Sequence, residues 1–403
     1  MPNHRPYGNL MDYIIWRGDL PVRQIPWTPI DSLLLAVMSY QPFGREASTE
    51  TGLSLQQLCT QGLSCPRDVP AEKQRIQMIT LMASQPRFAD MRVFLQESTS
   101  DTDISIQFSA LSCCVPDGPV VISYRGTDHT LVGWKEDFMM SYLSPVPAQS
   151  AALTYLERIA SLTDRPLVLT GHSKGGNLAA YAAARAPECI RKRIIQVCSF
   201  DGPGLDDETI ESQGYAQIRP VLLSVIPNGS VVGLLMNYHP VYTVVTSTTV
   251  GLFQHDPLTW ELCGAHFHEA DETTRSSQLM NETVHTWLKE REPDEIRGFV
   301  EILFTTLEKL YLHRGSEDLS DVQLVHMTDA AAYIRTLDPE KRSMIASLLA
   351  SFFNIGKENY LQIMLQKPVE NVLNELQGKL KELTIPRKTG YSASVSSEER
   401  NRS

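Results

Sequence analysis

One serine in this sequence has the neighbours that acyl-transfer chemistry requires. Residues 171–175 read Gly-His-Ser-Lys-Gly, a G-x-S-x-G motif. The apolar run 166–170 predicts a strand before the motif, and the alanine-rich run 176–186 predicts a helix after it. A serine on a sharp turn between a strand and a helix projects its hydroxyl beyond the sheet, and small neighbours let the backbone pass. We therefore predict that Ser173 is a nucleophile.

A second turn is expected to lie beside this serine. The strand predicted over 120–124 runs into Arg-Gly-Thr at 125–127. Together with the serine motif, this turn resembles the class 3 lipases, an α/β-hydrolase family in which an aromatic-Arg-Gly-Ser/Thr turn supplies an oxyanion donor. The resemblance implies that the backbone N–H and hydroxyl of Thr127 fill this role. The backbone N–H of Lys174, at the start of the following helix, is expected to be the other donor.

The resemblance extends along much of the chain. Residues 134–138, Trp-Lys-Glu-Asp-Phe, are similar to the Trp-x-x-Asp stretch that follows the turn in class 3 lipases. The sequence is more similar still to a bacterial branch related to those lipases, a domain of unknown function. That similarity covers roughly residues 10 to 310. It is carried by the Lys-bearing serine motif and by Asp12-Tyr13, Trp16-Arg17-Gly18-Asp19, Phe200-Asp201-Gly202-Pro203-Gly204 and Gln254-His255-Asp256-Pro257.

An activated serine needs a histidine as its base, and in this fold the chain order is serine, acid, histidine. We predict that His255 is the base, because it follows the last predicted strand on a loop where the resemblance places the catalytic histidine. His239 and His266 are the alternatives. His172, inside the motif, is expected to be structural.

The acid is the point at which the sequence departs from class 3 lipases. Those enzymes carry Asp-x-Val-Pro after the next strand, but residues 226–233 contain no carboxylate. Asp201 ends the strand predicted over 194–200 and is the nearest substitute. It either orients His255 or caps its own turn, and in the second case Asn228 or Ser230 would orient the imidazole of a serine–histidine dyad.

The Lys174 side chain is a further departure, since an apolar residue usually follows the nucleophile in class 3 lipases. An ammonium group at the pocket mouth would suit a substrate with a carboxylate or phosphate. We expect instead that it points to solvent along the helix.

Alternating strands and helices must position these residues. Further strands are predicted over 93–95, 104–108, 221–225 and 241–245, with helices over 71–83 and 148–162. The pattern predicts an α/β-hydrolase fold, a mostly parallel central sheet flanked by helices, with a C-terminal helical extension. Residues 1–280 are expected to form the hydrolase-like domain, with 1–90 packed on its core. The extension is assigned to 281–385 and a disordered tail to 386–403.

Composition limits the classes of function. The chain has 403 residues and a formal charge of −11, which disfavours nucleic acid as a partner. No apolar run reaches the roughly 18 residues of a membrane span, and no signal peptide is evident, so the default location is cytoplasmic. The seven cysteines lack metal or redox spacing, and no metal or cofactor is expected. Oligomeric state has no sequence signal.

The leading hypothesis is therefore a serine esterase or lipase-like hydrolase acting on a small-molecule acyl ester or lipid-like substrate. The first alternative is a catalytically degenerate hydrolase that binds a ligand or partner without turnover. The second is an acyltransferase that keeps the same chemistry but passes the acyl group to an acceptor other than water.

Overall fold

The computed structural model describes residues 7–65, 69–101, 106–127, 135–137, 139–140, 143–236, 242–292, 294–298, 300–301, 339 and 342. The strands of this part are β1 Leu53–Ser54, β2 Arg92–Asp101, β3 Ile106–Cys114, β4 Val120–Tyr124, β5 Leu167–His172, β6 Ile194–Phe200, β7 Leu222–Pro227, β8 Thr243–Val245, β9 Leu262–Cys263 and β10 His266–Phe267. The α-helices are α1 Leu10–Arg17, α2 Pro29–Met38, α3 Leu55–Thr60, α4 Pro70–Ala83, α6 Pro147–Ser161, α7 Lys174–Arg185, α8 Glu188–Arg191, α9 Asp207–Ile210, α10 Gln213–Ile218 and α11 Arg275–Lys289. Five 3₁₀ turns complete the described elements: Glu46–Ser48, Arg219–Val221, Val232–Leu234, Gly251–His255 and Pro257–Thr259.

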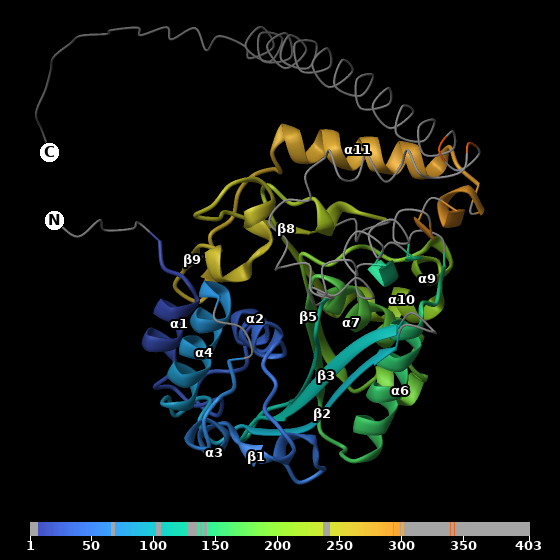
Figure 1. The fold of residues 1–403 in the computed structure, drawn as a ribbon. Coiled ribbons are helices and arrows are strands. Elements are labelled where there is room, and N and C mark those ends of the chain that lie inside the picture. The colour runs from blue at the N-terminus through green and yellow to red at the C-terminus, as the bar shows by residue number, and fades with distance from the viewer. Residues whose placement is uncertain are drawn as a thin grey trace, which may run out of the picture. The chain divides into compact units, whose positions relative to one another are not determined.

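Eight of the described strands form one sheet, in the order β1-β2-β3-β4-β5-β6-β7-β8. The pairs from β1 to β4 are antiparallel, and the pairs from β4 to β8 are parallel. Helix α6 connects β4 to β5, and α7 connects β5 to β6. Because crossovers between parallel strands are right-handed and these strands are neighbours in order, both helices lie on the same face of the sheet. The N-terminal helices α1, α2 and α4 cover the other face (Figure 1). The predicted α/β-hydrolase class, a mostly parallel sheet flanked by helices, is confirmed.

Alternation along the central strands divides the core in two. Val121 and Val168 belong to the buried cluster that contains α2, whereas Ile122 and Leu169 belong to the cluster that contains α6 and α7. Because successive side chains of a strand point to opposite faces, strands with apolar residues at every position require helices on both sides. This double burial holds the strand ends, and hence the residues that follow them, in fixed positions.

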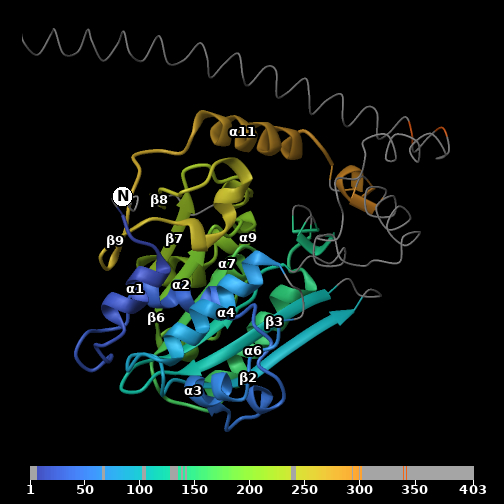
Figure 2. The ribbon, with the colours of Figure 1, turned by 60° about the vertical axis from the view of Figure 1, so that its left-hand side comes forward.

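The hairpin of β2 and β3 is longer than the sequence predicted, and it extends beyond the neighbouring strands in Figure 2. Its polar residues hid it from a search for apolar runs. Within it, the Ser109 hydroxyl donates to the carbonyl of Glu97 at 2.8 Å, and the hydroxyls of Ser112 and Tyr155 lie 2.9 Å apart. Buried polar side chains with such partners are compatible with a strand interior.

The C-terminal prediction is only partly covered by the described residues. Helix α11 begins at Arg275, six residues before the predicted helix and domain boundary at 281, because Thr274 caps it by accepting the backbone N–H of Ser277. The remaining part of the predicted extension lies outside the described residues, except 294–298, 300–301, 339 and 342, as does the tail 386–403. Among the helices that are described, none combines the length and apolarity needed to cross a membrane.

Candidate active site

Ser173 occupies a strained turn between β5 and α7. Its backbone angles are φ 57° and ψ −134°, in the left-handed range that side-chain-bearing residues rarely adopt. A Cβ added to Gly171 would lie 2.1 Å from the carbonyl of Gly175, and one added to Gly175 would lie 2.1 Å from the carbonyl of Tyr124. Only glycine fits both positions, so the two glycines of the motif allow the turn to form. The strand, turn and helix are in the predicted order.

Two backbone N–H groups are available next to Ser173. Lys174 is the first residue of α7, so its N–H has no partner within the helix and lies at the positive end of the helix dipole. The turn at 125–127 is adjacent, because a Cβ added to Gly126 would lie 3.0 Å from the Cβ of Ser173. The Thr127 hydroxyl donates a short hydrogen bond to the Asp137 carboxylate. That bond occupies the hydroxyl and leaves the backbone N–H of Thr127 as the donor that could face an oxyanion.

Asp201 and His255 are joined directly. Nδ1 of His255 lies 2.6 Å from Oδ2 of Asp201, although the residues are 54 positions apart in the chain. Asp201 follows the last residue of β6, and His255 ends the 3₁₀ turn that begins at Gly251. A carboxylate on Nδ1 holds the proton there and leaves Nε2 as the basic nitrogen.

The Asp201 carboxylate is buried and fully engaged. Its Oδ1 accepts a short hydrogen bond from the Ser230 hydroxyl and a second, of 3.1 Å, from the backbone N–H of Gly233. A Cβ added to Gly233 would lie 2.4 Å from this oxygen, so no larger residue fits there. Asp201 also has a positive φ of 47°. Ser230, one of the predicted alternatives for orienting the imidazole, therefore contacts the carboxylate instead.

His172 connects His255 to the serine turn. Its Nε2 lies 2.7 Å from the carbonyl oxygen of His255, its Nδ1 lies 3.2 Å from the Tyr40 hydroxyl, and its ring centroid is 4.5 Å from that of His255. Burial holds the pKa of His172 well below its usual value, and the neighbouring His255 acts in the same direction. His172 is therefore neutral, with Nε2 donating to His255 and Nδ1 accepting from Tyr40.

The Lys174 side chain contradicts the sequence-based expectation that it points to solvent. Its ammonium is buried, and it donates to the carbonyl and Oε1 of Gln107 at 2.9 and 2.8 Å and to Oε2 of Glu136 at 2.9 Å. Both members of the Lys174–Glu136 pair have fully buried side chains. An ammonium group has three protons, and each has an acceptor here, so the group cannot also bind a substrate anion at a pocket mouth.

Asp137 has an unusual electrostatic environment. Burial raises its pKa to about 6, while the Lys174 ammonium and the Thr127 hydroxyl oppose that rise and Glu136 adds to it. The carboxyl group is therefore close to half protonated at about pH 6 and ionised at neutral pH. Its Oδ1 is 3.8 Å from the Lys174 ammonium.

The structure thus brings Ser173, Asp201, His255, Thr127 and Lys174 together at the carboxyl ends of the parallel strands. The Ser173 hydroxyl makes no hydrogen bond to another residue in the part of the chain that the structure describes. Of the alternative bases, His239 lies outside the described residues, and His266 is exposed in β10. Tyr40 and Gln107 had no motif to indicate their roles, whereas Glu136 and Asp137 both lie in the Trp-Lys-Glu-Asp-Phe stretch at 134–138.

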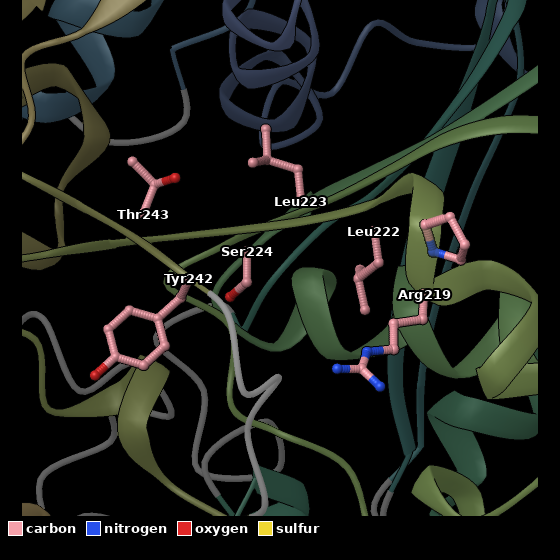
Figure 3. A pocket seen from close by; sticks show the side chains of 7 residues that line it. Arg219, Leu222, Leu223, Ser224, Tyr242 and Thr243 are labelled. Atoms are coloured by element: carbon pink, nitrogen blue, oxygen red, sulfur yellow. The ribbon is translucent and has the colours of Figure 1, made fainter.

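A shallow pocket elsewhere on the molecule is separate from this site. It has a volume of about 370 Å³ and is lined by Arg219, Pro220, Leu222, Leu223, Ser224, Tyr242 and Thr243 (Figure 3). These residues come from the 3₁₀ turn before β7, the amino-terminal half of β7 and the start of β8, whereas the candidate site lies at the carboxyl ends of the parallel strands. In the described residues, no group of three or more His, Cys, Asp or Glu side chains is placed to hold a metal ion.

The chain is similar to two solved structures: the M37 lipase, with 15% identity, a TM-score of 0.33 and coverage of 52% of this chain and 70% of the lipase, and a fungal lipase in complex with an inhibitor, with 12% identity, a TM-score of 0.32 and coverage of 62% and 94%. No curated protein matches the chain. The model of the family described as Mbeg1-like matches residues 82–305, which is more than half of the sequence. The chain therefore belongs to the Mbeg1-like family.

Proposed function

We propose that this protein is a serine hydrolase of the esterase or lipase-like type, which cleaves an acyl ester through Ser173. In this proposal His255 is the general base, Asp201 orients it, and the backbone N–H groups of Thr127 and Lys174 bind the oxyanion.

The proposed reaction follows from the positions of these groups. The Ser173 hydroxyl attacks the ester carbonyl carbon while its proton passes to Nε2 of His255. The negative charge that develops on the carbonyl oxygen is stabilised by the two N–H groups. The tetrahedral intermediate then collapses, the C–O bond to the alcohol breaks, and His255 returns the proton to the departing oxygen. Water repeats the sequence on the acyl-serine and releases the carboxylic acid.

The contact between Asp201 and His255 is the single observation that carries this proposal. The hypothesis of a degenerate hydrolase arose because the usual acid position is empty in the sequence. A buried carboxylate 2.6 Å from Nδ1 of His255 supplies the missing interaction. The strained φ of Ser173 supports the same conclusion, since a left-handed serine is maintained only where surrounding contacts enforce it.

Activity-based labelling tests the proposal. The wild-type protein should react covalently with a fluorophosphonate probe and hydrolyse p-nitrophenyl esters, and Ser173→Ala should do neither. A wild-type protein that is folded but unreactive toward both reagents would leave the degenerate, ligand-binding alternative. Ester turnover that produces a new acyl product in the presence of alcohols or thiols, in preference to free acid, would favour the acyltransferase alternative.

The acyl length of the substrate, the cellular location and the bacterial origin belong to the same proposal. A p-nitrophenyl ester series of increasing acyl length would define whether the substrate is a small ester or a lipid-like one. A cytoplasmic location and a bacterial origin, both expected from the sequence, would be tested by fractionation and by the distribution of sequences that share the Lys-bearing serine motif.

A further inference from the structure

We propose that the buried side chain of Lys174 is a positioning group for the oxyanion hole, which holds the segment carrying Glu136 and Asp137 against the serine turn. This inference rests on the proposed function, because it assigns a role within the same site. It concerns the side chain of Lys174, whereas the proposed function uses only the backbone N–H of that residue.

The location of Lys174 is the first argument. The residue directly follows Ser173 and begins α7, so any shift of its backbone moves both the nucleophile and one oxyanion donor. Its ammonium reaches Gln107 of β3 and Glu136, which lie 67 and 38 residues earlier in the chain. The side chain therefore ties the serine turn to two segments that are distant in sequence.

The second argument is the burial of the ion pair. An unpaired charge in a protein interior is strongly unfavourable, and an ion pair is tolerated there only when hydrogen bonds satisfy it. Glu136 meets this condition, because its Oε1 accepts from the N–H of Ala148 at 2.8 Å and its Oε2 accepts from the N–H of Gln107 at 2.9 Å as well as from Lys174. With hydrogen bonds to both of its oxygens, Glu136 has one well-defined position, and Asp137 follows it directly in the chain.

The third argument is the route from Asp137 to the oxyanion hole. The Asp137 carboxylate accepts from the Thr127 hydroxyl and lies 3.8 Å from the Lys174 ammonium. The backbone N–H of Lys174 is thus itself one oxyanion donor. Its side chain reaches Thr127, the residue with the other donor, through Asp137. The positive charge also lowers the pKa of Asp137 and so favours its ionised form, in which both carboxylate oxygens are acceptors for the Thr127 hydroxyl.

A matched pair of variants tests this role. Lys174→Met removes the ammonium but keeps an unbranched side chain about as long as the aliphatic part of lysine. Arg87→Met breaks another ion pair with fully buried side chains, Arg87–Asp31 at 2.5 Å, which joins the N-terminal helices and has no place in the site. Both variants should lower the melting temperature. Lys174→Met should also lower kcat for p-nitrophenyl butyrate by about 10²-fold with KM nearly unchanged, the size of loss typical of a misplaced catalytic group. Arg87→Met should keep the wild-type kcat per folded molecule.

Two further measurements separate positioning from general destabilisation. In Lys174→Met, the downfield proton signal of His255 Nδ1 should persist, because the contact with Asp201 does not involve Lys174. As a single variant, Asp137→Asn should also lower kcat. The double variant with Lys174→Met should lose little more, since both changes break the same chain of contacts. If Lys174→Met does not fold, Gln107→Met removes one of the three acceptors and should lower kcat about tenfold.

Several results would overturn the inference. Wild-type kcat in folded Lys174→Met would do so, as would an equal loss in Arg87→Met, or losses from Lys174→Met and Asp137→Asn that multiply. If Lys174→Met does not fold, a wild-type kcat in Gln107→Met would overturn the inference instead. A wild-type protein that neither labels nor hydrolyses esters would overturn the proposed function and this inference together. A reactive wild type with an unaffected Lys174→Met would overturn this inference alone.

Discussion

Replacing Asp201 by asparagine should almost abolish turnover, because the surroundings of the carboxylate determine how the new amide is oriented. Oδ1 of Asp201 accepts from both the Ser230 hydroxyl and the N–H of Gly233. An amide oxygen can keep both bonds, whereas an NH₂ group at that position would face two donors. The amide of Asp201→Asn is therefore expected to place its oxygen there and its NH₂ toward His255.

That orientation reverses the hydrogen bond to the imidazole. Nδ1 of His255, which lies 2.6 Å from a carboxylate oxygen in the wild type, would have to accept a hydrogen bond from the amide instead of donating one. The ring proton would move to Nε2, and the ring could no longer accept the proton of Ser173. The same change in a serine protease triad costs about 10⁴ in kcat, or on the order of 5 kcal/mol in the activation barrier.

Stability should change much less than activity. The amide oxygen keeps two of the three hydrogen bonds, so the variant should lose about 1 to 2 kcal/mol in the free energy of unfolding. Turnover of p-nitrophenyl butyrate and thermal melting, measured on one preparation, give both quantities. Ser230→Ala is the matched control, because it removes a donor to Asp201 without reversing the bond to His255 and should reduce kcat by less than about tenfold.

The competing interpretation, in which Asp201 only caps its turn, predicts the opposite pattern. Asp201→Asn would then be less stable by about 1 kcal/mol and would retain nearly full turnover. Retention of more than about a tenth of the wild-type kcat would refute the tautomer argument. A loss in Ser230→Ala as large as that in Asp201→Asn would also refute it, since the tautomer would not then be the cause.

Three further outcomes are expected. Ser173→Ala should fold with a melting temperature near that of the wild type and should hydrolyse no ester, because the turn accepts a small residue but loses its nucleophile. Gly233→Ala should lower both kcat and the melting temperature, since its Cβ would lie 2.4 Å from Oδ1 of Asp201; wild-type kinetics would show that the carboxylate is not held there. Burial depresses the pKa of His172, so below about pH 6.5 the unfolded chain binds a proton that the folded chain does not. The free energy of unfolding should therefore decrease as the pH is lowered through this range, by up to about 1.4 kcal/mol per pH unit. Chemical unfolding at several pH values should show a smaller slope for His172→Gln, and equal slopes would contradict the assignment.

The strand, turn and helix around Ser173 were predictable because their signal is local. Glycines on both sides of a serine, an apolar run before them and an alanine-rich run after them are read within about 20 residues. The proximity of Asp201 to His255 was predictable in a weaker sense. Residues that follow parallel strands lie together at the carboxyl ends of those strands. This made Asp201 a candidate for orienting His255, but it did not exclude Asn228 or Ser230.

The burial of Lys174 could not be predicted from its neighbours. The residue stands at the start of a helix, where a lysine usually faces water. Its acceptors come from Gln107 of β3 and from Glu136, which lie 67 and 38 residues earlier in the chain. The strand predicted over 104–108 already contained Gln107, but no local pattern indicated that its side chain lies beside the start of α7. The burial of Lys174 therefore depends on contacts between segments that are distant in sequence, which no local pattern reports.

Tyr40 connects the N-terminal segment to the candidate site around Ser173. It follows α2, whose buried face packs on the sheet, and its hydroxyl lies 3.2 Å from Nδ1 of His172. The same hydroxyl would lie 2.2 Å from a Cβ added to Gly126, so Tyr40 also limits the turn that carries Thr127. A fragment that began at β2 would keep the three triad residues in its sequence. It would lose the group that sets the tautomer of His172, and with it the support for the backbone of His255.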